Sequence, residues 1–167
     1  MATRAVVSPE EYVRMSFDGP DCEYLDGEIV ERNLGERPHS QVQLRLSVFF
    51  AALGKTRPVH PLPEIRVRVS PTRYRIVDLA VFAGEAPTEN VPSRPPLVAI
   101  EIVSRDDRHT EIVEKLDEYL RWGVRHVWLV DPWLRKLYVY SSSGLSEVAG
   151  YELPEFEARI PAAEILG

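Results

Sequence analysis

Residues 97–103 read Leu-Val-Ala-Ile-Glu-Ile-Val, an apolar run interrupted by a single acid, Glu101. A short apolar run that follows a polar, proline-rich segment predicts a central β-strand covered on both faces. A carboxylate inside such a strand is costly unless a metal, a lysine or backbone donors pair with it. Glu101 is therefore either a functional ligand or a buried glutamate held by an ordinary ion pair. This strand alone leaves both interpretations open.

The preceding segments predict two antiparallel strands, one of which carries a second acid. In residues 64–69 apolar and polar residues alternate, which is typical of a strand with one buried face. A turn at residues 70–72 leads to a second strand over residues 74–82. This strand contains Asp78 between apolar residues, although aspartate is disfavoured in strands. Asp78 is either a second ligand or a strand-end residue that faces water.

Residues 109–122 predict a helix with one cation near its buried face. Its inward stripe is formed by Ile112, Leu116 and Tyr119. Successive helical residues advance by about 100°, so Lys115 lies at the border of this stripe. Lys115 either points towards the sheet or covers the edge of the core with its aliphatic stem.

The remaining segments predict the rest of an α/β (α+β) fold. We expect helices over residues 9–15 and 38–53, a hairpin joining 23–25 to 28–31 through Asp26-Gly27, strands over 124–130, 136–140 and 145–151, and a turn near 162–166. The helix over 38–53 is apolar over a wide arc, which predicts that it is well buried. One mixed sheet flanked by helices is the natural packing of these elements. Nothing in the sequence marks a domain boundary, so residues 1–167 are expected to form a single domain.

Composition narrows the class of protein. The 167 residues carry 20 Lys plus Arg against 26 Asp plus Glu, a formal charge of −6. This argues against a protein that coats nucleic acid by bulk charge, but not against a local binding site. A single cysteine excludes an internal disulfide framework and a multi-cysteine zinc site. With no signal-peptide pattern and no membrane-length apolar run, we expect a cytoplasmic protein without membrane contact.

Together, the three candidate groups predict a metal-dependent site. Two adjacent strands each offer one acid, Asp78 and Glu101, and the following helix offers Lys115. Two carboxylates with waters and substrate phosphates are what Mg²⁺ favours, and Mn²⁺ is the natural substitute. The ion would polarise a phosphoryl oxygen and help to generate hydroxide. The lysine would orient the attacking water or stabilise the developing negative charge.

Several stretches of the sequence, in their order and spacing, carry a family resemblance that extends over nearly the whole chain. They are residues 23–30 (EYLDGEIV), 39–40 (HS), 75–82 (RIVDLAVF), 96–104 (PLVAIEIVS), 115–119 (KLDEY) and 123–132 (GVRHVWLVDP). The chain resembles the PD-(D/E)XK nuclease superfamily, and in particular its bacterial branch of restriction-endonuclease domains, formerly a domain of unknown function. The resemblance implies a restriction-endonuclease-like mixed sheet flanked by helices. It also implies metal-dependent hydrolysis of DNA phosphodiester bonds.

The resemblance assigns roles to individual residues. It makes Asp78 the motif aspartate and Glu101 the second acid, both as metal ligands and catalytic residues. The chain departs from the motif at Val77, where a proline is usual, and at Val103, where the superfamily usually has lysine. In this branch the lysine comes from the following helix, which gives the catalytic role to Lys115. Tyr119, on the same helix face, is expected to support the ligands.

Other residues are secondary candidates. Glu64 is either an extra metal ligand or an ion-pair partner, and His39 either caps or packs against its helix or acts as a base. Arg66, Arg68, Arg73 and Arg75 form the densest basic segment. These arginines either grip a phosphate backbone or form a solvated edge that discourages strand addition.

Three hypotheses of function follow. The leading one is a Mg²⁺-dependent endonuclease with DNA as substrate. The second is a catalytically degenerate binding or assembly module with the same fold, which the absence of lysine at Val103 favours. The third, a two-carboxylate glycosidase, has less support because Trp122, Trp128 and Trp133 lie away from the acids in sequence. A homodimer is expected from the apolar strand at 137–140 and from the symmetry that duplex cleavage requires.

Overall fold

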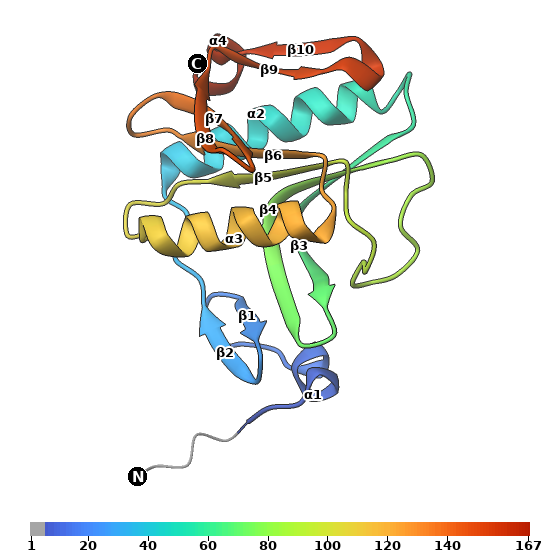
Figure 1. The fold of residues 1–167 in the computed structure, drawn as a ribbon, viewed down its shortest axis with the longest axis vertical. Coiled ribbons are helices and arrows are strands. Elements are labelled where there is room, and N and C mark those ends of the chain that lie inside the picture. The colour runs from blue at the N-terminus through green and yellow to red at the C-terminus, as the bar shows by residue number, and fades with distance from the viewer. Residues whose placement is uncertain (1–5) are drawn as a thin grey trace.

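The computed structural model describes residues 6–167 and contains helices on both faces of a large sheet (Figure 1). In chain order the elements are α1 (Pro9–Arg14), β1 (Cys22–Leu25), β2 (Glu28–Glu31), α2 (Arg37–Leu53), β3 (Val59–Ser70), β4 (Arg73–Ala83), β5 (Val98–Ile102), α3 (His109–Trp122), β6 (His126–Asp131), β7 (Lys136–Ser141), β8 (Gly144–Val148), β9 (Gly150–Leu153), the 3₁₀ turn η1 (Pro154–Phe156), β10 (Ala158–Pro161) and α4 (Ala162–Leu166). The structure thus confirms the helices at 9–15 and 109–122 and the Asp26-Gly27 hairpin. It also confirms the two strands that contain Asp78 and Glu101.

The sheet is mixed. Within residues 6–167, eight strands join in the order β2-β1-β4-β5-β6-β7-β8, and β3 pairs with β4. The β5–β6 pair is parallel and the other pairs are antiparallel. A separate two-stranded sheet is formed by β9 and β10.

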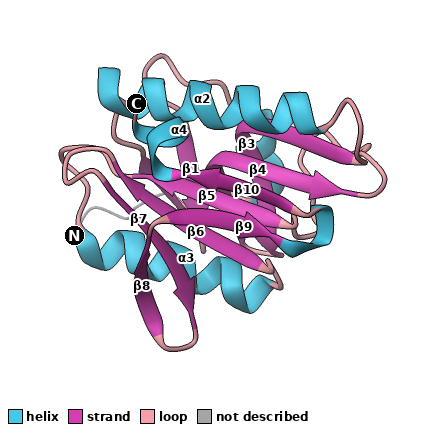
Figure 2. Cartoon of the chain, turned by 90° about the horizontal axis from the view of Figure 1, so that it is seen from above, coloured by secondary structure: helices cyan, strands magenta, loops and turns pink. Residues whose placement is uncertain are grey.

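The two long helices cover opposite faces of this sheet (Figure 2). Leu46 and Phe50 of α2 pack into one apolar cluster with Trp128. Leu116 and Tyr119 of α3 belong to the cluster on the other face. A mixed sheet flanked by helices is the predicted fold class, which is confirmed.

One edge of β4 is only partly paired, and this creates the space for the site. β3 pairs with β4 from Ala83 to Arg73 and so occupies one edge along its whole length. β5 and β1 share the other edge, where β5 pairs with residues 79–81 and β1 with residues 73–74. Between these pairings, residues 75–78 face no other strand of the described chain on that side. Side chains therefore have to satisfy the backbone groups exposed there.

Two strand boundaries differ from the sequence prediction. β3 begins at Val59 rather than at residue 64 and includes Pro61 and Pro63, which are tolerated because β3 pairs only with β4. The single strand expected over 145–151 is divided between β8 and β9. At the start of β9, a side chain on Gly150 would meet the carbonyl of Ile160 at 2.7 Å, so glycine permits the close approach of β10. The expected turn at 162–166 is the short helix α4.

The prediction that the helix over 38–53 is well buried is wrong for one of its faces. Leu46 and Phe50 are fully buried, but Leu44 is 64% and Val48 60% exposed. The helix turns by about 100° per residue, so only one stripe of an apolar segment can face the sheet. At 17 residues α2 is the longest helix described. None of the helices in residues 6–167 combines the length and hydrophobicity needed to span a bilayer.

The apolar strand that suggested a homodimer is internal to the sheet. β7 pairs with β6 on one side and with β8 on the other. Its backbone is therefore not available for pairing with a second chain.

The contrast between Leu46 and Leu44 gives a test of the packing. We expect Leu46→Ala to lower the free energy of unfolding by about 3 kcal/mol, because it leaves a cavity under α2. The same change at the exposed Leu44 should stay within about 0.5 kcal/mol of the wild type. Urea denaturation monitored by circular dichroism measures both values, and equal losses would contradict this orientation of α2.

Candidate active site

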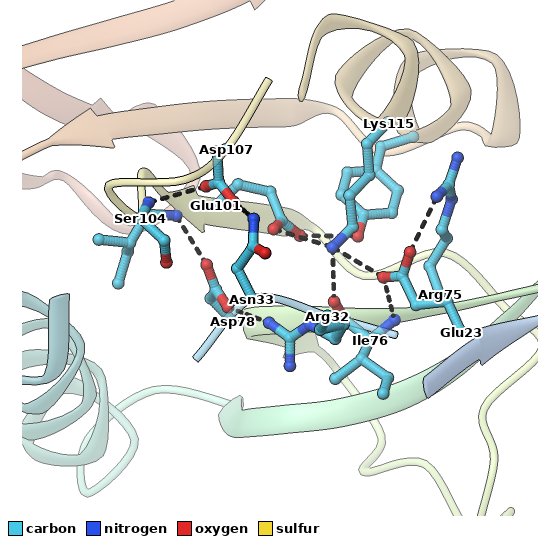
Figure 3. Close-up of polar contacts among 12 residues, drawn as sticks. Glu23, Arg32, Asn33, Arg75, Ile76, Asp78, Glu101, Ser104, Asp107 and Lys115 are labelled. Atoms are coloured by element: carbon cyan, nitrogen blue, oxygen red, sulfur yellow. Dashed lines mark hydrogen bonds and ion pairs between the residues drawn. The ribbon is translucent and has the colours of Figure 1, made fainter. Parts of the chain in front are cut away.

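A cavity of about 310 Å³ lies beside the open stretch of the β4 edge, and its lining includes Asp78, Glu101 and Lys115. These residues come from β4, β5 and α3, respectively. The structure thus brings together the three groups that the sequence singled out, although they are far apart along the chain. Their polar contacts are drawn in Figure 3.

Asp78 is 2% exposed, and both of its carboxylate oxygens are engaged. Oδ2 accepts a hydrogen bond from the backbone N–H of Ile102 at 2.7 Å and lies 3.2 Å from Nε2 of His39. Oδ1 lies 2.5 Å from the guanidinium of Arg32. Burial alone would raise the pKa of Asp78, but the hydrogen bond from His39 and the charge of Arg32 outweigh it and lower the pKa. Asp78 is therefore a carboxylate.

Glu101 stands next to Asp78 across the sheet. Leu79 and Ile100 are the last pair of the antiparallel β4–β5 ladder, and Asp78 and Glu101 are the next residues beyond it on the two strands. Glu101 accepts hydrogen bonds from the hydroxyl of Tyr119 at 2.7 Å and from Lys115 at 3.0 Å. Its burial and the negative charge of Asp78 raise its pKa in spite of Lys115. Burial of the carboxyl group is the largest cause of this upward shift.

Lys115 uses its ammonium group to join three strands. Nζ donates to the carbonyl of Ile76 at 2.8 Å, and it lies 2.8 Å from Glu23 and 3.0 Å from Glu101. Burial lowers the pKa of Lys115, but Glu101 and Glu23 raise it by more, and the net shift is upwards. Lys115 is therefore a fixed positive charge, and its three N–H donors match the three acceptors around it.

Glu23 is a site residue that the sequence did not reveal. Its carboxylate accepts from the N–H of Ile76 at 2.9 Å and pairs with Arg75 at 2.8 Å, in addition to Lys115. Burial opposes ionisation, but Lys115 and Arg75 dominate and lower the pKa of Glu23 to about 2. The sequence around Glu23 carries no alternation of polar and apolar residues that would mark its side chain as buried. In the structure, successive residues of β1 are buried.

Arg32, the second residue that the sequence did not reveal, connects Asp78 to Glu64. Its Nη1 lies 2.5 Å from Glu64, and Gln43 donates to both Glu64 and the carbonyl of Asp78 at 2.8 Å. Glu64 has φ 50°, a left-handed conformation that costs about 1–2 kcal/mol in a non-glycine residue. The pairs on either side, Pro63 with Leu79 and Ile65 with Val77, keep one register, so Glu64 lies opposite Asp78 between β3 and β4.

The four arginines of the basic segment do not form one strip. Val67 pairs directly with Arg75, so Arg75 shares a face with the buried Val67, while Arg66 and Arg68 point to the other face. Arg75 is buried between Glu23 and Glu118. Arg73 pairs with Glu118 and also with Asp26 at 2.6 Å. Arg73 and Arg75 are therefore ion-pair residues of the fold rather than free phosphate contacts.

The other two arginines of the segment remain nearer the surface. Arg66 lies over the ring of Tyr12 at 4.7 Å, and Arg68 is exposed. Alternation along β3 explains this division, because neighbouring residues in a strand point to opposite faces.

The donor set suits Mg²⁺. In residues 6–167 no group of three or more His, Cys, Asp or Glu side chains is arranged to hold a metal by itself. Mg²⁺ does not need one, because it keeps several waters and binds through one or two carboxylates and substrate phosphates. Asp78 and Glu101 line one cavity, and burial, with a smaller contribution from the charge of Asp78, raises the pKa of Glu101. A cation between them would relieve the repulsion between the two carboxylates, so these residues fit the ion.

Comparison with known proteins agrees with this architecture. Residues 9–166 match the model of the Uma2 family, described as "Putative restriction endonuclease". A crystal structure from Anabaena variabilis ATCC 29413, described as "a putative nuclease belonging to DUF820", is 21% identical with a TM-score of 0.83, covering 96% of this chain and 97% of that chain. Similarity at this identity shows a shared fold. None of the curated proteins compared matches significantly.

The resemblance inferred from the sequence motifs is thereby confirmed at the level of the family. The family model extends over almost all of the described residues, including β4, β5 and α3. This chain belongs to the Uma2 family of restriction-endonuclease-like proteins.

Proposed function

We propose that this chain is a Mg²⁺-dependent endonuclease that hydrolyses DNA phosphodiester bonds, with Asp78 and Glu101 as metal ligands. The observation that carries the proposal is the convergence of two buried carboxylates and one buried ammonium on a single cavity. Membership of a family described by nuclease activity supports the reaction class. Mn²⁺ would replace Mg²⁺ because it prefers the same oxygen ligands.

In this proposal the metal ion, Lys115 and Tyr119 have different roles in catalysis. When bound, the ion would polarise the phosphoryl oxygen and lower the pKa of a coordinated water. Lys115 cannot serve as a general base, because it is protonated and its three donors are engaged. It supplies fixed positive charge near the phosphate, where negative charge grows in the transition state. Tyr119 fixes the rotamer of Glu101 through its 2.7 Å hydrogen bond.

Glu23 positions Lys115. Its carboxylate holds the ammonium from the side opposite Glu101 and is itself fixed by Arg75 and the N–H of Ile76. A group held by several partners keeps its geometry, which an electrostatic catalyst requires. Lys115 can in this way replace the lysine that the superfamily usually has at the position of Val103.

The alternative is a binding or assembly module that has lost catalysis. It is favoured by Arg32, which occupies one oxygen of Asp78 at 2.5 Å and competes with a metal for it. This module would bind neither Mg²⁺ nor Mn²⁺ while remaining folded. Calorimetric metal titration distinguishes it from the nuclease.

Assembly and location belong to the same proposal. A symmetric homodimer in the cytoplasm would bring two sites to the two strands of a duplex. Sedimentation analysis with and without duplex DNA tests the dimer.

The first prediction concerns catalysis. We expect Glu101→Gln and Asp78→Asn to reduce nicking of supercoiled plasmid in Mg²⁺ by at least about 100-fold, since each removes a charge from the metal site. Glu111→Gln is the matched control, because Glu111 lines the same cavity but is exposed, and within residues 6–167 its ion pair is with Arg108 at 3.7 Å. It should cut at nearly the wild-type rate. Equal nicking rates for the wild type and Asp78→Asn would contradict the proposed metal centre.

The second prediction concerns pH. We expect Glu23→Gln to lower the free energy of unfolding at pH 7 by about 3 kcal/mol, because it leaves buried cations unpaired. The pKa of Glu23 is about 2 in the folded chain against an ordinary value of 4.5. Its contribution is thus complete above pH 4.5 and is lost as the pH falls towards 2. Urea denaturation across this range should show the two proteins converging in acid, and a constant difference would contradict the role of Glu23.

A further inference from the structure

The guanidinium of Arg32 lies where a cation beside Asp78 would have to sit. Arg32 follows directly after β2, and its side chain is only 17% exposed. One nitrogen lies 2.5 Å from Oδ1 of Asp78 and another 2.5 Å from Glu64. Figure 3 shows the guanidinium of Arg32 directed at the carboxylate of Asp78.

The oxygen that Arg32 occupies is the one left for a metal. Oδ2 of Asp78 already accepts from Ile102 and lies 3.2 Å from His39. Within residues 6–167, Oδ1 pairs with Arg32 alone. A divalent ion therefore needs the same atom as Arg32, and the two cations would repel each other inside one cavity.

The other cations of the site are not free to leave. Lys115 supports the carbonyl of Ile76, and Arg75 is buried between Glu23 and Glu118. Within the described part of the chain, the guanidinium of Arg32 contacts only carboxylates. It borders a second cavity of about 250 Å³, whose lining also includes Glu64 and Asp21. The guanidinium can move towards this space and keep its pairing with Glu64.

We propose that Arg32 is an internal counter-cation of the metal-free protein, which releases Oδ1 of Asp78 when a divalent ion binds. This inference rests on the proposed metal centre and deepens it. Arg32 stabilises the two acids while no ion is bound and lowers the apparent affinity for the ion, because part of the binding free energy is used to displace it. The concentration of divalent ion needed to fill the site is therefore set by an arginine that is not itself a metal ligand.

The test is a titration of the full chain with Mn²⁺. Calorimetry measures the heat of binding, and electron paramagnetic resonance measures the concentration of free Mn²⁺. We expect Arg32→Met to bind Mn²⁺ at least about tenfold more tightly than the wild type. Its melting temperature without metal should fall below that of the wild type, and Mn²⁺ should raise it by more. Arg32→Lys, which keeps the charge but lacks the planar fork of the guanidinium, should bind with intermediate affinity and serves if Arg32→Met folds poorly.

The matched control is Arg108→Met. Arg108 lines the same cavity, but its side chain is 79% exposed and lies 3.7 Å from Glu111. Because charges at the surface are screened by salt, its removal should change the Mn²⁺ affinity by less than about twofold. A similar gain in both variants would mean that net charge, and not displacement, sets the affinity, and would overturn the inference.

Two further outcomes separate this inference from the proposed function. If wild type binds Mn²⁺ and Arg32→Met binds no more tightly, Arg32 does not compete, while the metal centre stands. If neither protein binds Mn²⁺, both the metal centre and the displacement are overturned. Asp78→Asn, which should abolish binding in either background, reports whether the titrated site is this one.

Discussion

The architecture of the site depends on one buried ammonium group. Lys115 reaches from α3 to strands β1, β4 and β5 and meets an acceptor on each of them. Together with Glu23, it satisfies both the N–H and the carbonyl of Ile76, which would otherwise be bonded by a neighbouring strand. The sheet can thus stay open at the centre of β4 while both backbone groups of Ile76 remain hydrogen-bonded. The cavity can exist because the side chains of Glu23 and Lys115 make the hydrogen bonds that a neighbouring strand would otherwise make.

The same replacement explains how so many charges are buried together. An isolated buried carboxylate is strongly unfavourable, and removing one partner of a buried pair costs about 3–5 kcal/mol. Here Glu23, Glu101 and Asp78 are neutralised by Lys115, Arg75 and Arg32 from different parts of the chain. Each acid is fixed in place by donors that also hold the fold, so the site and the scaffold are stabilised by the same contacts.

Local sequence was enough to predict the parts of the site that lie on regular elements. Glu101 stands out because it interrupts an apolar strand, and Lys115 because of the helical period. Glu23 and Arg32 carry no such signal, because their importance arises from packing a hairpin against β4, 52 and 46 residues away in sequence from their partners Arg75 and Asp78. The basic segment was misleading for a related reason. Alternation divides its arginines between two faces, and buried acids from elsewhere engage Arg73 and Arg75.

The two prolines of β3 have a consequence for how copies of this chain can meet. A proline inside a paired strand has its nitrogen directed away from the partner and offers no hydrogen there. The free side of β3 around Pro61 and Pro63 therefore lacks two of the donors that an incoming strand would require. Continuous intermolecular sheets, including fibrillar aggregates, are disfavoured along this border. An assembly that uses this border has to form through side-chain contacts, and the outer edge of β3 therefore acts against polymerisation of the chain.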